Sequence, residues 1–172
     1  VFSANKAPAG GAVHLSNARA LWQKATIFST NTADFFGGAV HVTDGGNTSW
    51  VGKTIFTGNT AGSEGGALYV DDDCKASWTG VMTFSGNVAS YDGGAMYASD
   101  GSEVWWAGET VFSRNLAGDQ GGAVSVEGTI RCSSTAKATF ISNIATNEGG
   151  ALHVGYDGNV SWGADTLFYK NT

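Results

Sequence analysis

The sequence predicts an all-β chain: a right-handed parallel β-helix of about six coils, with three short strands in each coil. Two observations predict this fold. A pair of motifs recurs every 28 residues, and no segment of the repeat is long enough for a helix. Self-similarity at a fixed period is typical of a solenoid, in which each repeat buries its apolar face against its neighbours. We therefore expect residues 1–172 to form one β-helical repeat domain.

The two motifs are Phe-x-x-Asn, usually followed by x-Ala, and Gly-Gly-Ala. The first starts at Phe2, Phe28, Phe56, Phe84, Phe112, Phe140 and Phe168. The second starts at Gly10, Gly37, Gly65, Gly93, Gly121 and Gly149. Because the spacing is constant after a slightly shorter first unit, equivalent side chains should lie directly above one another. Crossovers between parallel strands are right-handed in nearly all proteins, so we expect that hand.

The first extended piece of the unit, GGALYV, has one apolar face. Leu68 and Val70 share that face, and Tyr69 points to the other. The positions equivalent to Leu68 and Val70 are apolar in the other coils as well. The outward position carries His14, His41, Tyr69, Tyr97, Ser125 and His153. We interpret one face as core and the other as surface.

The second and third pieces predict two aromatic columns inside the coil. The tryptophan column comprises Trp22, Trp50, Trp78, Trp106 and Trp162, and Ser134 stands at the one equivalent position that has no tryptophan. The phenylalanine column comprises Phe28, Phe56, Phe84, Phe112 and Phe140. A threonine column has the same parity and should also point inward: Thr26, Thr54, Thr110 and Thr166. Since each buried aromatic side chain hides about 150–250 Å², these rungs should stabilise the stack.

The asparagine of the first motif predicts a buried amide ladder. Phe and Asn three residues apart cannot share a face of a regular strand, so the chain must bend between them. An inward amide at the bend can bond unpaired backbone groups and the amide of the next coil, as in cross-β stacks. The ladder residues are Asn31, Asn59, Asn87, Asn115 and Asn143. Gly-Gly then permits positive φ or a close backbone approach at the next corner.

Composition restricts the class of protein. The formal charge of −6 and only 14% charged residues disfavour a nucleic acid or an anionic membrane as partner. No apolar run approaches about 18 residues, so no membrane-spanning helix is predicted. Cys74 and Cys132 should lie two coils, or about 10 Å, apart, beyond the usual disulfide separation. We expect two thiols that are free or bridged to another molecule.

The paired motif, as in Phe56, Asn59 and Gly65-Gly66-Ala67, resembles the repeat of the chlamydial polymorphic outer-membrane proteins. These are β-helical surface adhesins, and similar repeats occur in other surface proteins. The resemblance covers the whole chain. It implies a right-handed parallel β-helix and an extracellular or cell-surface location, and the residues that carry it are scaffold positions.

Parallel β-helices include polysaccharide-active enzymes, whose sites need convergent acids and bases in a cleft. Here the motif spacing leaves no room for a long inserted loop, and no Ser/His/Asp arrangement with plausible geometry is expected. We therefore predict no enzyme activity and no cofactor. A polysaccharide-active enzyme is the third alternative.

Two polar groups are candidate sites. Asp44, Asp72 and Asp100 share one repeat position and could supply oxygens to calcium, although solvated turn residues are the simpler interpretation. Asn47 and Asn159 begin glycosylation sequons at another shared position, in a predicted turn. We predict glycans on both if a eukaryote secretes the chain.

Aromatic residues outside the core columns are candidate contacts. Outward His14, His41, Tyr69, Tyr97 and His153 could form a strip that stacks on sugars or on a neighbouring molecule. Phe35, Phe36, Tyr91 and Trp105 could act in the same way. Scattered exposed aromatics are the simpler interpretation.

The chain begins and stops at the same phase of the repeat, and neither end shows a capping segment. Repeat stacks normally end in caps that cover unpaired backbone groups. Because none is seen, we expect an uncapped domain that is part of a longer or polymerising assembly and stacks end to end. The leading hypothesis is a non-catalytic structural segment of an extracellular fibre, stalk or cell-surface coat. The alternative is an adhesin passenger-type domain that binds a surface glycan or protein.

Overall fold

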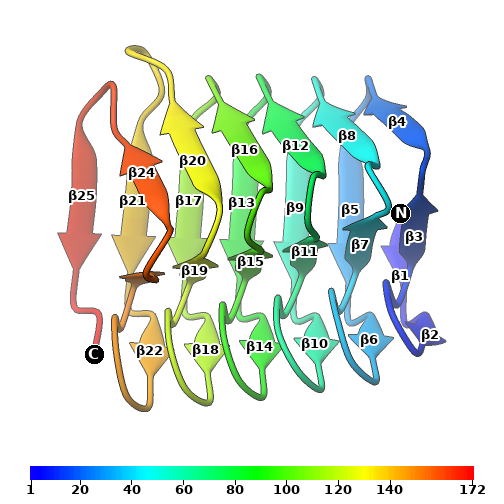
Figure 1. The fold of residues 1–172 in the computed structure, drawn as a ribbon, viewed down its shortest axis with the longest axis horizontal. Coiled ribbons are helices and arrows are strands. Elements are labelled where there is room, and N and C mark those ends of the chain that lie inside the picture. Colours follow the sequence, from blue (N-terminus) through cyan, green and yellow to red (C-terminus); the bar gives the residue numbers. More distant parts are fainter.

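The structure, a computed structural model, describes all residues 1–172 and consists of strands and turns without a helix. The strands stack coil upon coil along one axis, with the two ends of the chain at opposite ends of the stack (Figure 1). Every strand pairing is parallel and joins equivalent strands of successive coils. The predicted solenoid is confirmed.

Four parallel sheets run along the axis. Sheet A contains β1 (Phe2–Ser3), β5 (Thr26–Ser29), β9 (Thr54–Thr57), β13 (Met82–Ser85), β17 (Thr110–Ser113), β21 (Ala138–Ile141) and β25 (Thr166–Tyr169). Sheet B contains β2 (Lys6–Ala7), β6 (Thr32–Ala33), β10 (Thr60–Ala61), β14 (Val88–Ala89), β18 (Leu116–Ala117) and β22 (Ile144–Ala145). Sheet C contains β3 (Val13–Ser16), β7 (Val40–Thr43), β11 (Leu68–Val70), β15 (Met96–Ala98), β19 (Val124–Val126) and β23 (Leu152–Val154). Sheet D contains β4 (Arg19–Trp22), β8 (Asn47–Trp50), β12 (Lys75–Trp78), β16 (Glu103–Trp106), β20 (Thr129–Cys132) and β24 (Asn159–Ser161).

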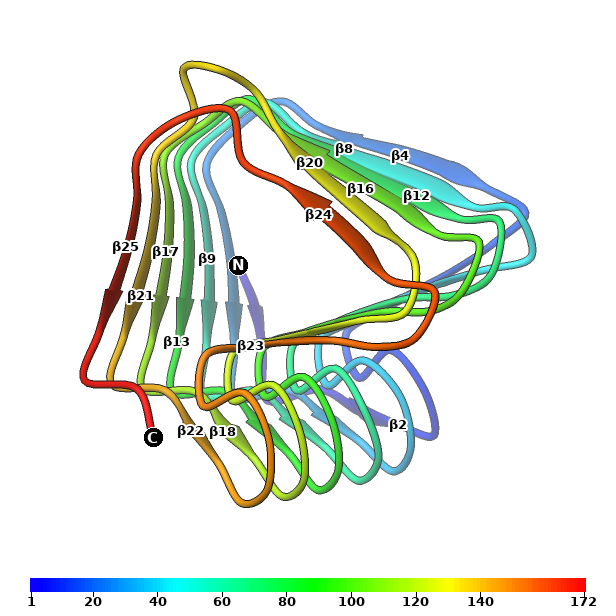
Figure 2. The ribbon, with the colours of Figure 1, turned by 60° about the vertical axis from the view of Figure 1, so that its left-hand side comes forward.

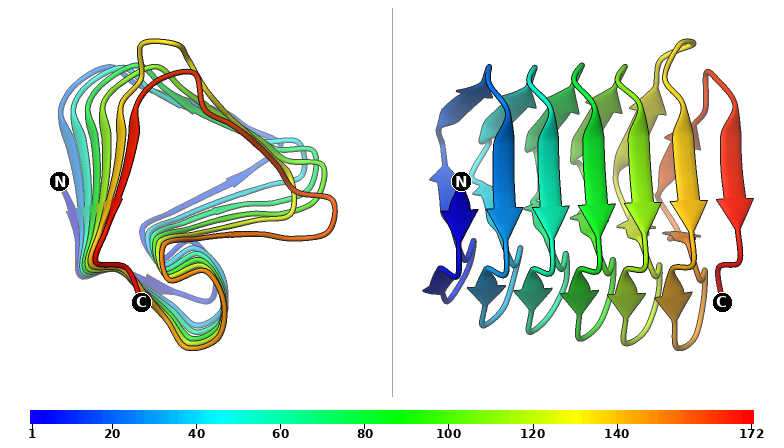
Figure 3. Two further views of the ribbon diagram at one scale, coloured as in Figure 1. Left: turned by 90° about the vertical axis from the view of Figure 1, so that its left-hand side faces the viewer. Right: turned by 180° about the vertical axis from the view of Figure 1, so that it is seen from behind.

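Sheets A, C and D are the three strands expected in each coil, and sheet B is a fourth, two-residue strand at the Asn-x-Ala segment. The strand is short because the asparagine turns inward just before it and a loop follows it at once. Together sheet B and that loop form a lobe beside sheet C, seen at the bottom of each coil in Figures 2 and 3. Viewed from the C-terminal end, the chain winds counterclockwise as it advances toward the viewer, which makes the solenoid right-handed (Figure 3, left).

The phenylalanine column forms a continuous stack inside sheet A. Successive rings lie 4.7–5.0 Å apart and within 14° of parallel from Phe2 to Phe168. The inner five rings are fully buried. Thr54 and Thr110 lie inward beside them, also fully buried, which confirms the expected parity of the threonine column. Each ring therefore removes its neighbours' faces from water as well as its own.

The asparagine ladder is complete and satisfies every group that the bend leaves unpaired. In the third coil, Asn59 Nδ2 donates to Asn87 Oδ1 at 2.9 Å and to the Phe28 carbonyl at 3.1 Å. The Asn59 backbone N–H donates to the same Asn87 oxygen at 3.0 Å. The pattern repeats from coil to coil, and the five predicted ladder asparagines are fully buried.

The two glycines of Gly-Gly-Ala have different physical roles. Gly65 has φ = +64°, the left-handed conformation that disfavours a side chain. Gly66 has ordinary φ, but a Cβ there would overlap the Gly94 carbonyl oxygen of the next coil and the Val88 carbonyl. The motif is thus a corner at which the backbones of successive coils touch.

The tryptophan column differs from the expectation in the fifth coil. Register pairs Trp106 with Cys132, so the cysteine and not Ser134 occupies that position. The turn between β19 and β20 has only two residues, Glu127 and Gly128, and the following corner is correspondingly longer, with residues 133–137 protruding (Figures 1 and 2). Because the two changes compensate, the motif spacing conceals them. The corner does accommodate extra residues, contrary to the expectation from the spacing.

Candidate functional site

The lobe covers part of the outer face of sheet C, where the sequence predicted a free strip. Lobe residues Phe36, Glu64, Asp92, Gln120 and Glu148 follow one another coil by coil and face the outward column of sheet C, His41, Tyr69, Tyr97, Ser125 and His153. Phe36, for example, packs 4.9 Å from Tyr69 and 5.9 Å from His41, centroid to centroid. We call this line of contacts the lobe seam. His41 is 6% exposed and Ser125 1% exposed, so the prediction that they lie free at the surface is wrong. Tyr69, Tyr97 and His153 are half-buried, and His14 is exposed.

His41 is a neutral ring within the lobe seam. Burial, and next the charge of His14, lower the pKa of His41. Neither ring nitrogen has a hydrogen-bond partner, and Asp71 Oδ2 lies 3.7 Å from Nε2. At neutral pH this pair is therefore a polar contact and not an ion pair.

Two seam carboxyl groups bind protons more tightly than usual. Burial, and next the neighbouring Asp92, raise the pKa of Glu64; burial likewise raises the pKa of Asp92. Asp92 Oδ1 accepts a bond from the Gln120 backbone N–H at 3.0 Å, whereas Glu64 Oε2 is buried without a donor. Burial also raises the pKa of Tyr69 to about 12, so its hydroxyl stays protonated.

At the C-terminal part of the seam, Ser125, His153 and Glu148 line up. Ser125 Oγ lies 3.3 Å from His153 Nδ1, and Glu148 Oε2 lies 3.5 Å from His153 Nε2. The sequence did not predict this arrangement, because the lobe that brings Glu148 to the histidine is not visible in the motif spacing. The order matches nucleophile, base and acid. The serine hydroxyl, however, is buried, and a substrate carbonyl cannot reach it in this conformation.

The aspartate column does not converge on one point. Asp44 Oδ2 and Asp72 Oδ1 each accept a serine hydroxyl at 2.6 Å, from Ser16 and Ser99. Asp100 Oδ1 accepts the N–H of Gly101 at 2.8 Å. Nowhere in the chain do three His, Cys, Asp or Glu side chains gather as metal ligands would. These are the bonds that aspartates make in turns.

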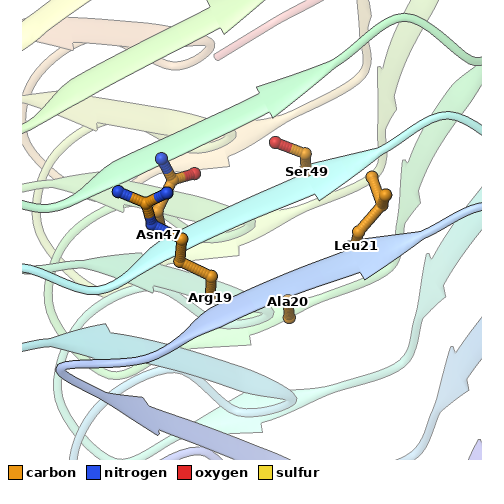
Figure 4. A pocket seen from close by; sticks show the side chains of 5 residues that line it. All are labelled: Arg19, Ala20, Leu21, Asn47 and Ser49. Carbon is orange, nitrogen blue, oxygen red and sulfur yellow. The ribbon is translucent and has the colours of Figure 1, made fainter.

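The two sequon asparagines lie in one column on the outer face of sheet D. The sequence predicted both in a turn. Instead Asn47 is the first residue of β8 and Asn159 the first residue of β24. Asn47 lies in a shallow hollow with Arg19, Leu21 and Ser49, open to solvent (Figure 4). Asn159 is exposed. Both amides face outward, where a glycan has room.

Of the four candidate aromatic contacts outside the columns, three stand free of the core. Phe35 and Tyr91 on the lobe are more than half exposed, and Trp105 in the middle of the outer face of sheet D is 41% exposed. Register places Trp105 between Ser77 and Arg131. These three side chains, unlike Phe36, are available to a partner.

Both cysteines are free and buried, one before the start of a sheet D strand and the other at the end of a different one. Cys74 lies in the turn before β12, and Cys132 ends β20. Burial raises the pKa of both thiols, to about 12 for Cys132. Because thiolates react more readily than thiols, burial and the raised pKa both disfavour reaction of these groups in the folded chain.

Four continuous parallel sheets around stacked Phe and Asn columns define a parallel β-solenoid. Three segments of the chain also match a known repeat. Residues 53–71, 82–99 and 137–155 match the Chlamydia polymorphic membrane protein repeat, as the motifs suggested.

Searches of curated proteins and of solved structures give no match. The structure holds no apolar helix of bilayer-spanning length.

Proposed function

We propose that this chain is a non-catalytic, rigid segment of an extracellular cell-surface protein, which sets the length of a stalk, fibre or coat. One observation carries the proposal: the Asn–Asn amide bonds continue without a break from Asn5 to Asn171. Each coil is thereby fixed to the next through a buried polar bond as well as through sheet pairing. Such a stack resists bending and stretching along its axis. The repeat family, named for membrane proteins, supports a surface location.

Surface location and rod shape are tested on the parent protein in its own cells. Antibodies raised against residues 1–172 should label intact cells. Electron micrographs of the purified parent should show a rod that lengthens by about 4.8 Å for each 28-residue repeat. Labelling only after permeabilisation, or a globular particle, would contradict the proposal.

The first and last coils present complementary hydrogen-bonding groups, which support end-to-end contact. β1 pairs only with β5, and β25 only with β21. Asn5 Oδ1 accepts no bond, while the Asn171 backbone N–H and one Nδ2 hydrogen donate none. A further coil of the same type, from a second copy or from the parent chain, would complete both ladders.

End-to-end contact of the chain 1–172 is tested by sedimentation. Growth into chains of three or more copies should be lost when Asn5→Lys places a charge over the first rung. Ser77→Lys, on the side of the solenoid, should leave it unchanged. Species larger than a dimer that survive Asn5→Lys would rule out this contact.

A second candidate function is adhesion, which the exposed Trp105, Phe35 and Tyr91 favour. Aromatic faces bind sugar rings and partner side chains at low entropic cost. Binding of the chain to cells or glycans should fall in Trp105→Ala and persist in Ser77→Ala. Equal binding by both variants would remove Trp105 from the contact.

A further inference from the structure

The outer face of sheet A carries no charged side chain. It has two columns of outward residues. The first column is Ile27, Ile55, Thr83, Val111, Thr139 and Leu167, and the second is Ser29, Thr57, Ser85, Ser113, Ile141 and Tyr169. The outer face of sheet D, by contrast, carries Arg19, Lys75, Glu103 and Arg131. The outer face of sheet A is therefore less polar than that of sheet D and better suited to be covered.

The face is also flat. Its strands run nearly parallel to one another from β1 to β25 (Figure 3, right), and the phenylalanine rings on its inner side lie within 14° of parallel in every pair of neighbouring coils. Sheets normally twist by about 20° or more per strand, and untwisted ones are typically stabilised by stacking. A flat, uncharged sheet can pack against another at about 10 Å.

We propose that a second copy of this chain packs against sheet A, face to face, about a two-fold axis parallel to the solenoid axis. This operator reverses the strand direction and leaves each coil opposite its equivalent. The first column of one copy then lies over the second column of the other. The two copies close into a dimer, not a filament.

The sizes of the facing side chains fit this operator. In the second to fifth coils a larger or β-branched residue meets a small hydroxyl residue, as with Ile55 over Thr57 and Val111 over Ser113. In the next coil the order reverses, with Thr139 over Ile141. Two large side chains meet only at β25, where Leu167 lies over Tyr169. Interdigitation of large with small is how sheet faces pack closely.

Four charges on the rim of the face fit the same operator, and the other two, Lys53 and Lys137, would face the uncharged Gly58 and Ser142. Glu109 precedes β17 and Arg114 follows it; Asp165 and Lys170 flank β25 in the same way. All four are exposed, and none forms an ion pair within the chain. Reversal of the strands brings Glu109 toward Arg114 of the second copy and Asp165 toward Lys170, twice each by symmetry. A two-fold axis along the strands would instead bring Glu109 onto itself.

The area is sufficient for a dimer of modest affinity. A strand with its flanks spans about 20 Å, and six coils rise about 29 Å, so about 600 Å² per copy is available. The total, about 1,200 Å², lies at the lower end of specific interfaces. We therefore expect a reversible monomer–dimer equilibrium.

Sedimentation of the chain 1–172 tests the proposal. Val111→Lys, which places a charge in the middle of the face, should weaken dimerisation at least about tenfold. Ser77→Lys on the outer face of sheet D is the matched control and should leave it unchanged. A chain that is monomeric throughout its soluble range, or a dimer that tolerates Val111→Lys, would overturn the proposal.

A charge exchange tests the operator itself. Glu109→Arg should weaken the dimer about tenfold, because Arg then faces Arg114 of the second copy twice. The double variant Glu109→Arg with Arg114→Glu should restore it. No rescue would overturn this arrangement. Both positions are exposed, so folding is not at stake. Species larger than a dimer that respond to Asn5→Lys and not to Val111→Lys report end-to-end stacking and count against sheet A.

Discussion

Asn87 and Asn115 share one side-chain oxygen between two bonds: both the amide Nδ2 and the backbone N–H of Asn87 donate to Asn115 Oδ1, each at 3.0 Å. Asn59 makes the same pair of bonds to Asn87. Asn87→Ala should therefore leave the Asn59 backbone N–H buried without an acceptor and remove the Asn87 Nδ2 bond to the Phe56 carbonyl. We expect a loss of about 2–4 kcal/mol in the free energy of unfolding, measured by urea titration. Ser85→Ala, outward on the adjoining strand, is the control and should cost under about 1 kcal/mol.

The corner glycines predict a second contrast. Gly66→Ala should strongly destabilise the stack, by more than about 2 kcal/mol, because the new methyl group overlaps two backbone carbonyls. Gly86 has φ = +62° with open space around its Cβ position, and Arg114 adopts similar φ at the equivalent site. Gly86→Ala should cost only about 1 kcal/mol. Similar melting temperatures for the two variants would show that the coils do not touch at the corner.

Two tryptophans one strand apart should respond differently to truncation. Trp78 is buried, stacks 4.9 Å from Trp106 and donates to Thr110 Oγ1 at 2.8 Å. Trp78→Ala should cost about 3–5 kcal/mol through the cavity it leaves. Trp105 points outward, and Trp105→Ala should stay within about 1 kcal/mol. Thermal and urea unfolding measure both, and an equal loss would contradict the inward and outward assignment of sheet D.

Glu64 should reduce stability at neutral pH. Its pKa is raised in the folded state, so folding favours the protonated form, and this advantage is lost as pH rises through the folded pKa. Glu64→Gln should therefore stabilise the chain at pH 7, and the gain should shrink as pH falls toward 4. Gln120 already occupies the equivalent position two coils away. Unfolding free energies of both chains across this pH range test the sign, and a glutamine variant less stable at pH 7 contradicts it.

His41 should reduce the stability of the folded chain at acidic pH, whereas Glu64 reduces it at neutral pH. Its pKa is lowered in the folded state, so below about pH 6.5 the unfolded chain binds the proton first and the native state loses stability. His41→Phe should flatten the pH dependence of the melting temperature between pH 6.5 and 5. His14→Phe should reduce the slope only in part, because the charge of His14 is the second cause of the lowered pKa of His41. A variant that keeps the full wild-type slope would assign the acid sensitivity to other groups.

The sequence predicted the interior well because the interior is periodic. Phe56, Asn59 and Trp78 recur at fixed spacing, and strict spacing in a parallel stack leaves one arrangement in which their side chains superpose. Parity then placed Thr54 beside the phenylalanines. These inferences needed only strand geometry and the repeat.

The sequence predicted the perimeter less well because corners are not periodic. Cys132, and not Ser134 as predicted, occupies the tryptophan column. A shortened turn and a lengthened corner leave the number of residues between successive motifs unchanged, so the spacing did not reveal the shift. His41 and Ser125 were predicted to lie at the surface since alternation reports which face a residue takes, not what covers that face. The covering element is the lobe, whose loop has Gly, Ser and acidic residues typical of any turn. That Glu109 and Arg114 lie at opposite ends of one strand is visible only once the bounds of that strand are known.

The cancelling changes in the fifth coil separate the outline of this molecule from its axis. Residues 133–137 bulge outward while Phe112, Phe140 and Phe168 stay in line. The sequence of one corner loop can thus change without displacing the coils on either side of it. A new surface can arise by substitution or insertion in a single loop, at unchanged length of the solenoid.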